Sequence, residues 1–205
     1  EVVRELLGRG AAVDATSKRA MTPLWIACRN GHLEVAGELL EGGAVVDVAD
    51  ERGMTPLWVA CREGHIGLVR ELLERGAAVD AVESGGITPL WIACRNGHTE
   101  VVRELLGRGA AVDATSKRAM TPLWIACRNG HLEVAGELLE GGAVVDVADE
   151  RGMTPLWVAC REGHIGLVRE LLERGAAVDA VESGGITPLW IACRNGHTEV
   201  VRELL

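Results

Sequence analysis

The sequence predicts an all-α repeat fold, an α-solenoid in which pairs of helices stack one behind the other in a superhelix. The phrase TPLW recurs six times at intervals of 33 residues, from Thr22 to Thr187. Each unit holds two short stretches whose apolar residues have helical spacing. Neither stretch can bury its apolar side alone, so neighbouring units have to cover each other.

The unit 55–87 illustrates the expected elements in order. Thr55 and Pro56 are typical of a helix start, because a hydroxyl caps free N–H groups and proline suits the first helical position. A short apolar helix follows and ends at Gly64. A second helix ends at Gly76. The last residues, AAVDAVESGGI, are small or turn-forming and predict an extended connector with a tight hairpin.

A longer period contains the shorter one, since every residue from 1 to 106 recurs unchanged 99 positions later. We expect one solenoid over residues 1–205, as a segment of a longer array. The full repeats are expected at 22–54, 55–87, 88–120, 121–153 and 154–186, and the partial repeats at 1–21 and 187–205. A recent gene duplication, a designed sequence and an averaged filament sequence all remain possible origins of the duplication.

The net charge is −9, shared evenly between the two copies. This balance argues against a broad basic face for nucleic acid. No apolar run reaches the roughly 18 residues of a membrane span. We therefore expect neither nucleic acid nor a membrane span among the interactions of this chain.

The six cysteines and six histidines each fill one position of the repeat. Packed helices lie about 8–10 Å apart, whereas a disulfide needs Cα atoms closer than about 7 Å, so we expect small buried thiols. One histidine per unit, without a second ligand at a repeated offset, predicts a structural role and no metal site. No general-base dyad, phosphate-binding loop or nucleophile elbow is present. The sequence predicts no cofactor and no enzymatic activity.

The pattern G-x-TPL-x-x-A-x-x-x-GH-x-x-x-V-x-x-LL-x-x-GA-x-V-D is similar to the ankyrin repeat and covers the whole chain. The resemblance implies L-shaped units with two antiparallel helices and a projecting β-hairpin, stacked in a curved solenoid. It also implies that the first helices and hairpin tips line a concave face that binds other proteins.

The chain departs from the family pattern in several places. Tryptophan replaces the histidine that usually follows TPL, and cysteine replaces the second alanine of the first helix. Ala20 stands where the family prefers a glycine with positive φ, so we expect another turn at that tip. Gly37 and Gly67 lie inside second helices, where glycine costs about 0.5–1 kcal/mol. Drift on an exposed face and close approach of another chain both remain open explanations for these two glycines.

Tryptophan and arginine form a repeated pair on the first helix. Trp25 and Arg29 are four residues apart, which places them on one side of the helix, and stacked units repeat the pair about every 10 Å. In one interpretation tryptophan fills the space between repeats and arginine is solvated. In the other, the arginine row beside tryptophan binds a partner, since both residue types are enriched in binding hot spots.

By the resemblance, a partner contacts the hairpin tips, the residue before TPL and the two residues before GH. With the tryptophans and the recurring arginines, the candidate partner-binding residues are Lys18, Arg19, Met21, Trp25, Arg29, Asn30, Glu51, Arg52, Met54, Trp58, Arg62, Glu63, Ser84, Gly85, Ile87, Trp91, Arg95, Asn96, Arg128, Arg161 and Arg194. Differences between units at these positions suit a tunable recognition face, but drift in exposed loops would also produce them.

Apolar residues at both ends of the segment indicate a second interaction. The candidate end-to-end stacking residues are Val2, Val3, Leu6, Leu7, Leu204 and Leu205. Further repeats or further copies of the chain would cover them, and contacts of this head-to-tail kind generate fibres when they do not close. The sequence therefore supports a scaffold that binds a protein partner, with a self-assembling structural fibre as the alternative.

Overall fold

The computed structural model describes residues 2–205, so residue 1 of the expected partial repeat 1–21 lies outside the described part. Residues 2–205 form thirteen α-helices and no β-strand, which confirms the predicted all-α solenoid. The helices are α1 (Val2–Gly8), α2 (Pro23–Asn30), α3 (Leu33–Glu41), α4 (Pro56–Glu63), α5 (Ile66–Glu74), α6 (Pro89–Asn96), α7 (Thr99–Gly107), α8 (Pro122–Asn129), α9 (Leu132–Glu140), α10 (Pro155–Glu162), α11 (Ile165–Glu173), α12 (Pro188–Asn195) and α13 (Thr198–Leu204).

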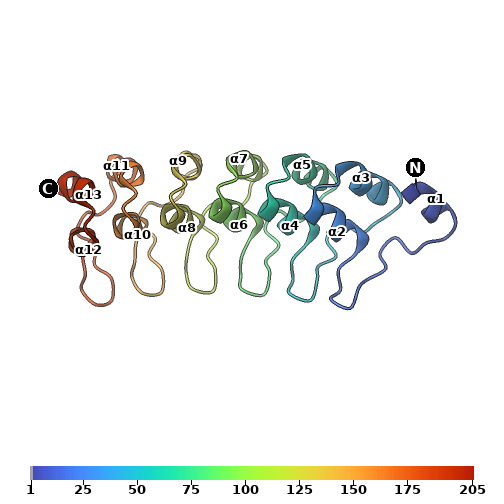
Figure 1. The fold of residues 1–205 in the computed structure, drawn as a ribbon, viewed down its shortest axis with the longest axis horizontal. Coiled ribbons are helices and arrows are strands. Elements are labelled where there is room, and N and C mark those ends of the chain that lie inside the picture. Colours follow the sequence, from blue (N-terminus) through green and yellow to red (C-terminus); the bar gives the residue numbers. More distant parts are fainter. Residues whose placement is uncertain (1) are drawn as a thin grey trace.

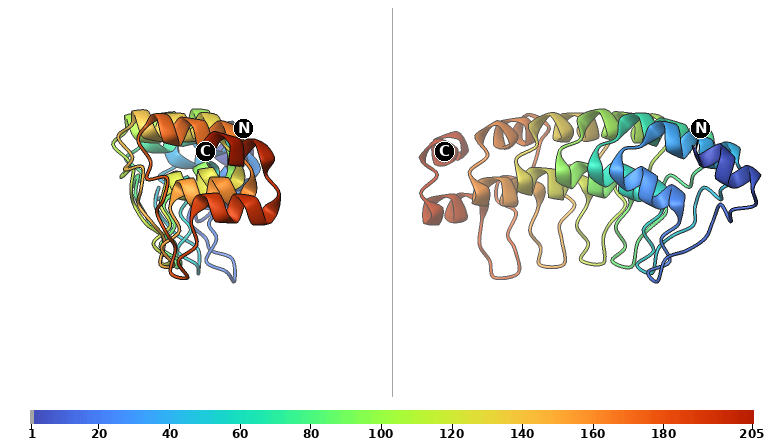
Figure 2. Two further views of the ribbon diagram at one scale, coloured as in Figure 1. Left: turned by 90° about the vertical axis from the view of Figure 1, so that its left-hand side faces the viewer. Right: turned by 45° about the vertical axis from the view of Figure 1, so that its right-hand side comes forward.

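The helices form two parallel rows (Figure 1). The even-numbered helices are the first helices of their units and lie in one row, and the odd-numbered second helices lie in the row above them. The connectors project as long loops from the side of the first helices, and the two ends of the chain lie at opposite ends of the molecule (Figures 1 and 2). Each unit therefore meets only the units before and after it.

Each first helix begins and ends as the sequence predicts. The Thr55 hydroxyl accepts a hydrogen bond from the backbone N–H of Trp58 at 3.2 Å, and the other five TPLW threonines make the same bond. Such a cap stabilises a helix by about 1 kcal/mol. Gly64 ends α4 with φ at 79°, a left-handed conformation that residues with a side chain rarely adopt.

The core is one seam that runs through all the units. Leu57 and Cys61 of α4 are fully buried, and so is Leu72 of α5, because the next helix pair covers them. Burying one such leucine is worth about 1.5–3 kcal/mol. Since equivalent residues of each inner unit are buried in the same way, the hydrophobic stabilisation depends on stacking and not on any single unit.

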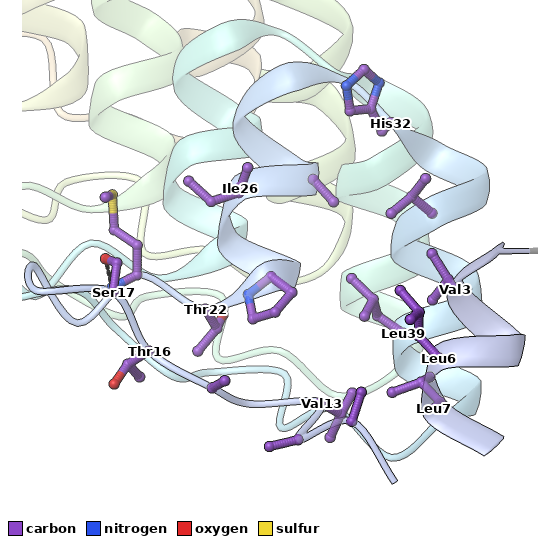
Figure 3. A pocket seen from close by; sticks show the side chains of 17 residues that line it. Val3, Leu6, Leu7, Val13, Thr16, Ser17, Thr22, Ile26, His32 and Leu39 are labelled. Atoms are coloured by element: carbon purple, nitrogen blue, oxygen red, sulfur yellow. Dashed lines mark hydrogen bonds between the residues drawn. The ribbon is translucent and has the colours of Figure 1, made fainter. Parts of the chain in front are cut away.

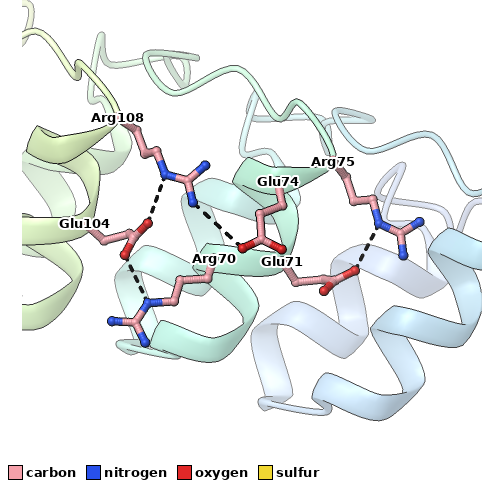
Figure 4. Close-up of polar contacts among 6 residues, drawn as sticks. All are labelled: Arg70, Glu71, Glu74, Arg75, Glu104 and Arg108. Carbon is pink, nitrogen blue, oxygen red and sulfur yellow. Dashed lines mark hydrogen bonds and ion pairs between the residues drawn. The ribbon is translucent and has the colours of Figure 1, made fainter.

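Ion pairs connect successive second helices on the outer surface. Arg70 of α5 donates to Glu104 of α7 at 3.0 Å, and Glu104 also accepts from Arg108 (Figure 4). The hydrogen bonds from Arg70 and Arg108 lower the pKa of the Glu104 carboxyl. Because the arginines are exposed, each pair contributes little by itself.

Glycine interrupts this line of ion pairs once in each copy. Gly37 and Gly136 occupy the helix position that Arg70 has in α5. A Cβ atom added at either glycine would meet nothing within 4 Å, so the described neighbours do not require glycine there. Glu71, which would otherwise receive the inter-repeat bond, pairs with Arg75 of its own unit instead (Figure 4).

The hairpin tips all share one turn, including the tip with alanine. Ala20 has φ of 58° and Ala119 has φ of 57°, in the same region as Gly53 at 81°. The expectation of another turn at Ala20 was therefore wrong. The backbone bond from Ser17 N–H to the Met21 carbonyl, at 3.0 Å, closes the tip. The contact between neighbouring tips also requires the shared turn, because Glu51 N–H bonds to the Arg19 carbonyl at 3.2 Å.

Replacing both Ala20 and Ala119 with glycine should stabilise the protein. A side chain with positive φ costs about 1 kcal/mol or more, and glycine removes that cost. We expect a higher urea midpoint, equivalent to about 1 kcal/mol for each site. The matched control is Ala15→Gly, where φ is not positive. This substitution should lower the urea midpoint or leave it unchanged. A lower midpoint for the double variant would show that the tip is not strained.

Candidate interaction surface

The tryptophan side chain links each unit to the next. Trp58 is 6 % exposed, and its indole Nε1–H donates at 3.0 Å to the backbone carbonyl of Ile87, the last residue before the next unit begins at Thr88. The same bond, at 2.9–3.0 Å, joins Trp25 to Met54 and recurs at Trp91, Trp124 and Trp157. Tryptophan therefore fills the space between repeats and also supplies the hydrogen bond that fixes their register.

A carboxylate supplies a second link that the sequence analysis missed. Asp47 accepts hydrogen bonds from the backbone N–H of Ala78 in the next unit, at 3.1 and 3.3 Å for its two oxygens. Asp14, Asp80, Asp113 and Asp146 do the same. The aspartate recurs in every GA-x-V-D stretch of the sequence. No local pattern, however, shows that it accepts a hydrogen bond from a different unit.

Histidine and glycine form a third link. The His98 ring Nε2 lies 3.0 Å from the Arg62 carbonyl oxygen of the preceding unit, and Asn96 Nδ2 donates to the same oxygen at 2.7 Å. A Cβ atom added to Gly64 would lie 2.6 Å from the His98 ring. The GH pair therefore serves stacking, with glycine needed both for its positive φ and for the ring of the next histidine.

Five of the six first-helix arginines lie over the tryptophan ring of their own helix. The guanidinium carbon of Arg29 is 5.4 Å from the centroid of the Trp25 ring, and Arg62 lies 5.5 Å from Trp58. Equivalent contacts occur at Arg128, Arg161 and Arg194. Each cation–π contact is worth about 0.5–1 kcal/mol at an exposed site. Tryptophan thus orients a row of charges on the face that also carries the hairpin tips.

Two hollows lie between these arginines and the hairpin tips. One has a volume of about 170 Å³ and is lined by four arginines and two acidic residues beside Trp124: Arg118, Arg128, Arg151, Arg161, Asp149 and Glu150. The other has a volume of about 380 Å³, and Arg52, Arg62 and Arg95 are among its lining residues. We call the surface formed by the hairpin tips, the first-helix arginines and these hollows the groove. Its arginines can donate several hydrogen bonds to an acceptor that enters it.

The predicted partner-binding residues differ in exposure. The exposed ones are Lys18, Arg19, Arg29, Asn30, Glu51, Arg52, Glu63, Ser84, Arg95, Asn96, Arg128 and Arg194. The partly buried ones are Met21, Met54, Arg62, Gly85, Ile87 and Arg161. Trp25, Trp58 and Trp91 are buried and lie in the stacking interface, so they offer a partner little more than a ring edge.

Comparison with known families identifies the fold. The family model described as ankyrin repeats (3 copies) matches residues 1–83, 77–149 and 138–205. The chain belongs to the ankyrin-repeat family. Ankyrin repeats are generally scaffolds for protein–protein interaction and are typically not enzymes, so the family implies protein partners. No curated protein matches the chain.

The first and last units of the described residues expose different features. Beside α2, an apolar pocket of about 540 Å³ is lined by Val3, Leu6 and Leu7 of α1 among others (Figure 3). At the other end, Trp190 is 50 % exposed and its indole has no acceptor within residues 2–205. Of the other predicted stacking residues, Val2 and Leu205 are exposed and Leu204 is partly buried.

The cysteines of this ankyrin array are free thiols, and all but the last are buried. Burial raises the pKa of Cys28 and Cys160 to about 12 and also raises the pKa of Cys61, Cys94 and Cys127. Cys193 is exposed, because no helix in the described part covers the outer side of α12. Within residues 2–205 no cluster of metal-ligating side chains occurs, and no helix has the length and apolarity to cross a membrane.

The indole bond can be tested with a matched pair of substitutions. Trp91→Phe removes the bond to Met120 and leaves a small void, so we expect a loss of about 1–3 kcal/mol in urea unfolding. Trp190→Phe changes the same repeat position where the indole has no acceptor, and it should shift stability by less than about 0.5 kcal/mol. Equal losses in the two variants would mean that the indole bond does not hold the stack.

Thiol accessibility gives an independent check of the seam. In the native protein a thiol reagent such as iodoacetamide should modify Cys193 and spare the five buried cysteines, because the thiolate is the reactive form and burial opposes it. Mass spectrometry of peptides would locate the label, and unfolding in urea should expose all six thiols. Rapid native labelling of Cys94 would contradict the continuous core.

Proposed function

We propose that the chain is a non-enzymatic scaffold that binds a segment of a protein partner along its concave face, in the groove. The observation that carries this proposal is the row of first-helix guanidinium groups, five of which lie over tryptophan rings. A rigid tryptophan base limits the motion of each arginine, so less conformational entropy is lost when a partner binds. Arginine is also among the residues most enriched in binding hot spots.

The hairpin tips support the same proposal. Their exposed residues differ within each copy, with Lys18 and Arg19 in one tip, Glu51 and Arg52 in the next, and Ser84 in the third. Their backbones are connected to each other by hydrogen bonds, such as Ser84 N–H to the Arg52 carbonyl at 2.8 Å. Variable side chains on a fixed backbone are suited to recognising one partner among many.

The absence of enzymatic activity also belongs to this proposal. The cysteines are the strongest nucleophiles of the chain, and burial raises the pKa of five of them. The rings of His98, His131, His164 and His197 each lie within hydrogen-bond distance of a backbone carbonyl of the preceding unit. Within residues 2–205 the groove therefore offers binding groups but no nucleophile–base pair.

An unbiased selection tests the groove. Peptides from a random display library are selected on the immobilised chain, and their binding sites are mapped by hydrogen–deuterium exchange. We expect protection at the hairpin tips and first helices. A groove variant, with alanine at Arg29, Arg62, Arg95, Arg128, Arg161 and Arg194, should bind the selected peptides at least about tenfold more weakly.

A second variant controls for the change in net charge. This outer-surface variant has alanine at Arg4, Arg70, Arg75, Arg103, Arg169 and Arg174, which lie on or beside the second helices and carry the same total charge. It should bind the peptides as the unmodified chain does. Protection confined to the second helices, or equal losses in the two variants, would refute binding in the groove.

We propose self-stacking of the 205-residue polypeptide as a second candidate, because its two end faces are complementary. The Trp190 indole lacks an acceptor within residues 2–205, while the Met21 carbonyl accepts only the hairpin bond from Ser17. If α12 of one copy packed beside α2 of another, the Trp190 indole would reach Met21 as Trp157 reaches Ile186. The arriving α13 would take the place of α1, which shares the sequence VVREL with it and has no buried residue.

Deleting residues 1–7 tests this second candidate. The deletion empties the place that α13 of another copy would occupy, so it should increase the mass observed by light scattering at high protein concentration. Adding Trp190→Ala should reverse the increase, because it removes the donor and most of the apolar contact. A polypeptide that stays monomeric with and without residues 1–7 would exclude end-to-end stacking.

A further inference from the structure

We infer that the groove takes an elongated acidic protein segment, with about one carboxylate for each repeat. This inference rests on the proposed function and adds the chemistry of the partner. It starts from the different surroundings of the arginines on the two sides of the molecule. On the second-helix side, from Arg4 to Arg174, every arginine contacts a glutamate: the eight are Arg4, Arg9, Arg70, Arg75, Arg103, Arg108, Arg169 and Arg174.

The groove arginines mostly lack such partners. Arg118, Arg128 and Arg151 line one hollow, and none of them makes an ion pair within the described residues. In the other hollow Arg52 and Arg95 are likewise unpaired, whereas Arg62 pairs with the adjacent Glu63 at 2.7 Å. Arg161 of the first hollow pairs with Glu162 in the same way. The groove therefore holds several arginines without an ion-pair partner, while Glu150 is the exposed acidic residue that lines the first hollow.

Several acidic side chains near these arginines are already engaged. Asp50 Oδ1 accepts the backbone N–H groups of Arg52 and Met54 at 2.9 and 3.0 Å, which closes the hairpin tip. Glu83 Oε1 does the same for Gly85 and Ile87 at 2.7 and 3.2 Å. Because these carboxylates are turned toward their own backbone, they compete little with a carboxylate that enters from outside.

The surroundings of the first-helix arginines favour a protein partner over a nucleic acid. Proteins that bind single-stranded nucleic acid stack bases on exposed aromatic rings, but Trp58, Trp91 and Trp124 are only 6, 5 and 2 % exposed. The whole chain also carries a net charge of −9. Outside the row of first-helix arginines this charge repels the continuous phosphate backbone of a nucleic acid. Separate carboxylates suit separate guanidinium groups, each of which binds a carboxylate through two parallel hydrogen bonds.

The spacing of the row limits the shape of the partner. Stacked helices repeat about every 8–10 Å. A polyproline II segment has three residues per turn and rises about 3.1 Å per residue, so every third residue returns to one face after about 9.3 Å. A peptide with glutamate at every third position in such a segment therefore presents one carboxylate to each arginine.

The test uses synthetic peptides labelled with a fluorescent dye. The probe is six repeats of Glu-Pro-Pro, and the matched control has the same composition with its six glutamates in one block. Lys-Pro-Pro repeats and an oligothymidine test the sign of the charge and the class of polymer. Fluorescence anisotropy should show that the chain binds the regular probe at least about tenfold more tightly than the blocked peptide, with affinity falling as salt rises.

Variants assign the binding to the groove. The groove variant should lose at least about tenfold in affinity for the regular probe, and the outer-surface variant should retain it. A third variant has lysine at the six positions of the groove variant. It keeps the charge but loses the paired hydrogen bonds of arginine to a carboxylate, so its affinity should lie between those of the unmodified chain and the groove variant. Unchanged far-UV circular dichroism shows that each variant is folded.

Three outcomes would overturn the inference. They are equal affinity for the regular and blocked peptides, no binding of the regular probe, and tighter binding of oligothymidine than of the regular probe. The selection from the random peptide library tells whether only the acidic partner is wrong or the proposed scaffold function as well. Selected peptides that protect the groove but carry no acidic residues would leave the scaffold function intact and remove the acidic partner.

Discussion

The contact between one repeat and the next is the constraint on which this structure depends. No helix pair buries its own leucines, so the hydrophobic term appears only when units stack. Apolar packing alone does not fix how two surfaces slide past each other. Here the carboxylate of Asp47 and the ring of His98 bond to the backbone of a neighbouring unit, and the indole of Trp58 bonds to the backbone of Ile87, directly before the next unit. These directional hydrogen bonds fix the register between neighbouring repeats, which apolar packing alone would not determine.

The interaction surface follows from this contact. Because the tryptophan ring is needed between repeats, its face is fixed in position, and the arginine four residues later lies over it. Because adjacent tips are bonded to each other, their exposed side chains also stand in a regular line. The groove is therefore as regular as the core, although none of its arginines contributes to the core.

Local signals in the sequence were enough for the helices and their ends. Thr55-Pro56 and Gly64 act on their own helix, so their effects could be predicted without knowing the neighbours. The role of Asp47 could not be predicted, because its donor belongs to the next unit. The turn at Ala20 was predicted wrongly, since its own preference is overruled by bonds at Ser17 and Arg19. For the site, arginine positions could be predicted, but only the structure shows which of them remain unpaired.

Gly37 and Gly136 interrupt the line of ion pairs on the outer surface once in each 99-residue copy. Two of every three neighbouring second-helix pairs carry the cross-link of the type Arg70 to Glu104, and the third does not. The α3–α5 and α9–α11 contacts therefore lack one cross-link that the other second-helix contacts have, and we expect small changes of curvature to concentrate there. Such places recur once in every 99 residues, while the bonds of tryptophan, aspartate and histidine lie on the other side of the second helices and do not depend on these ion pairs.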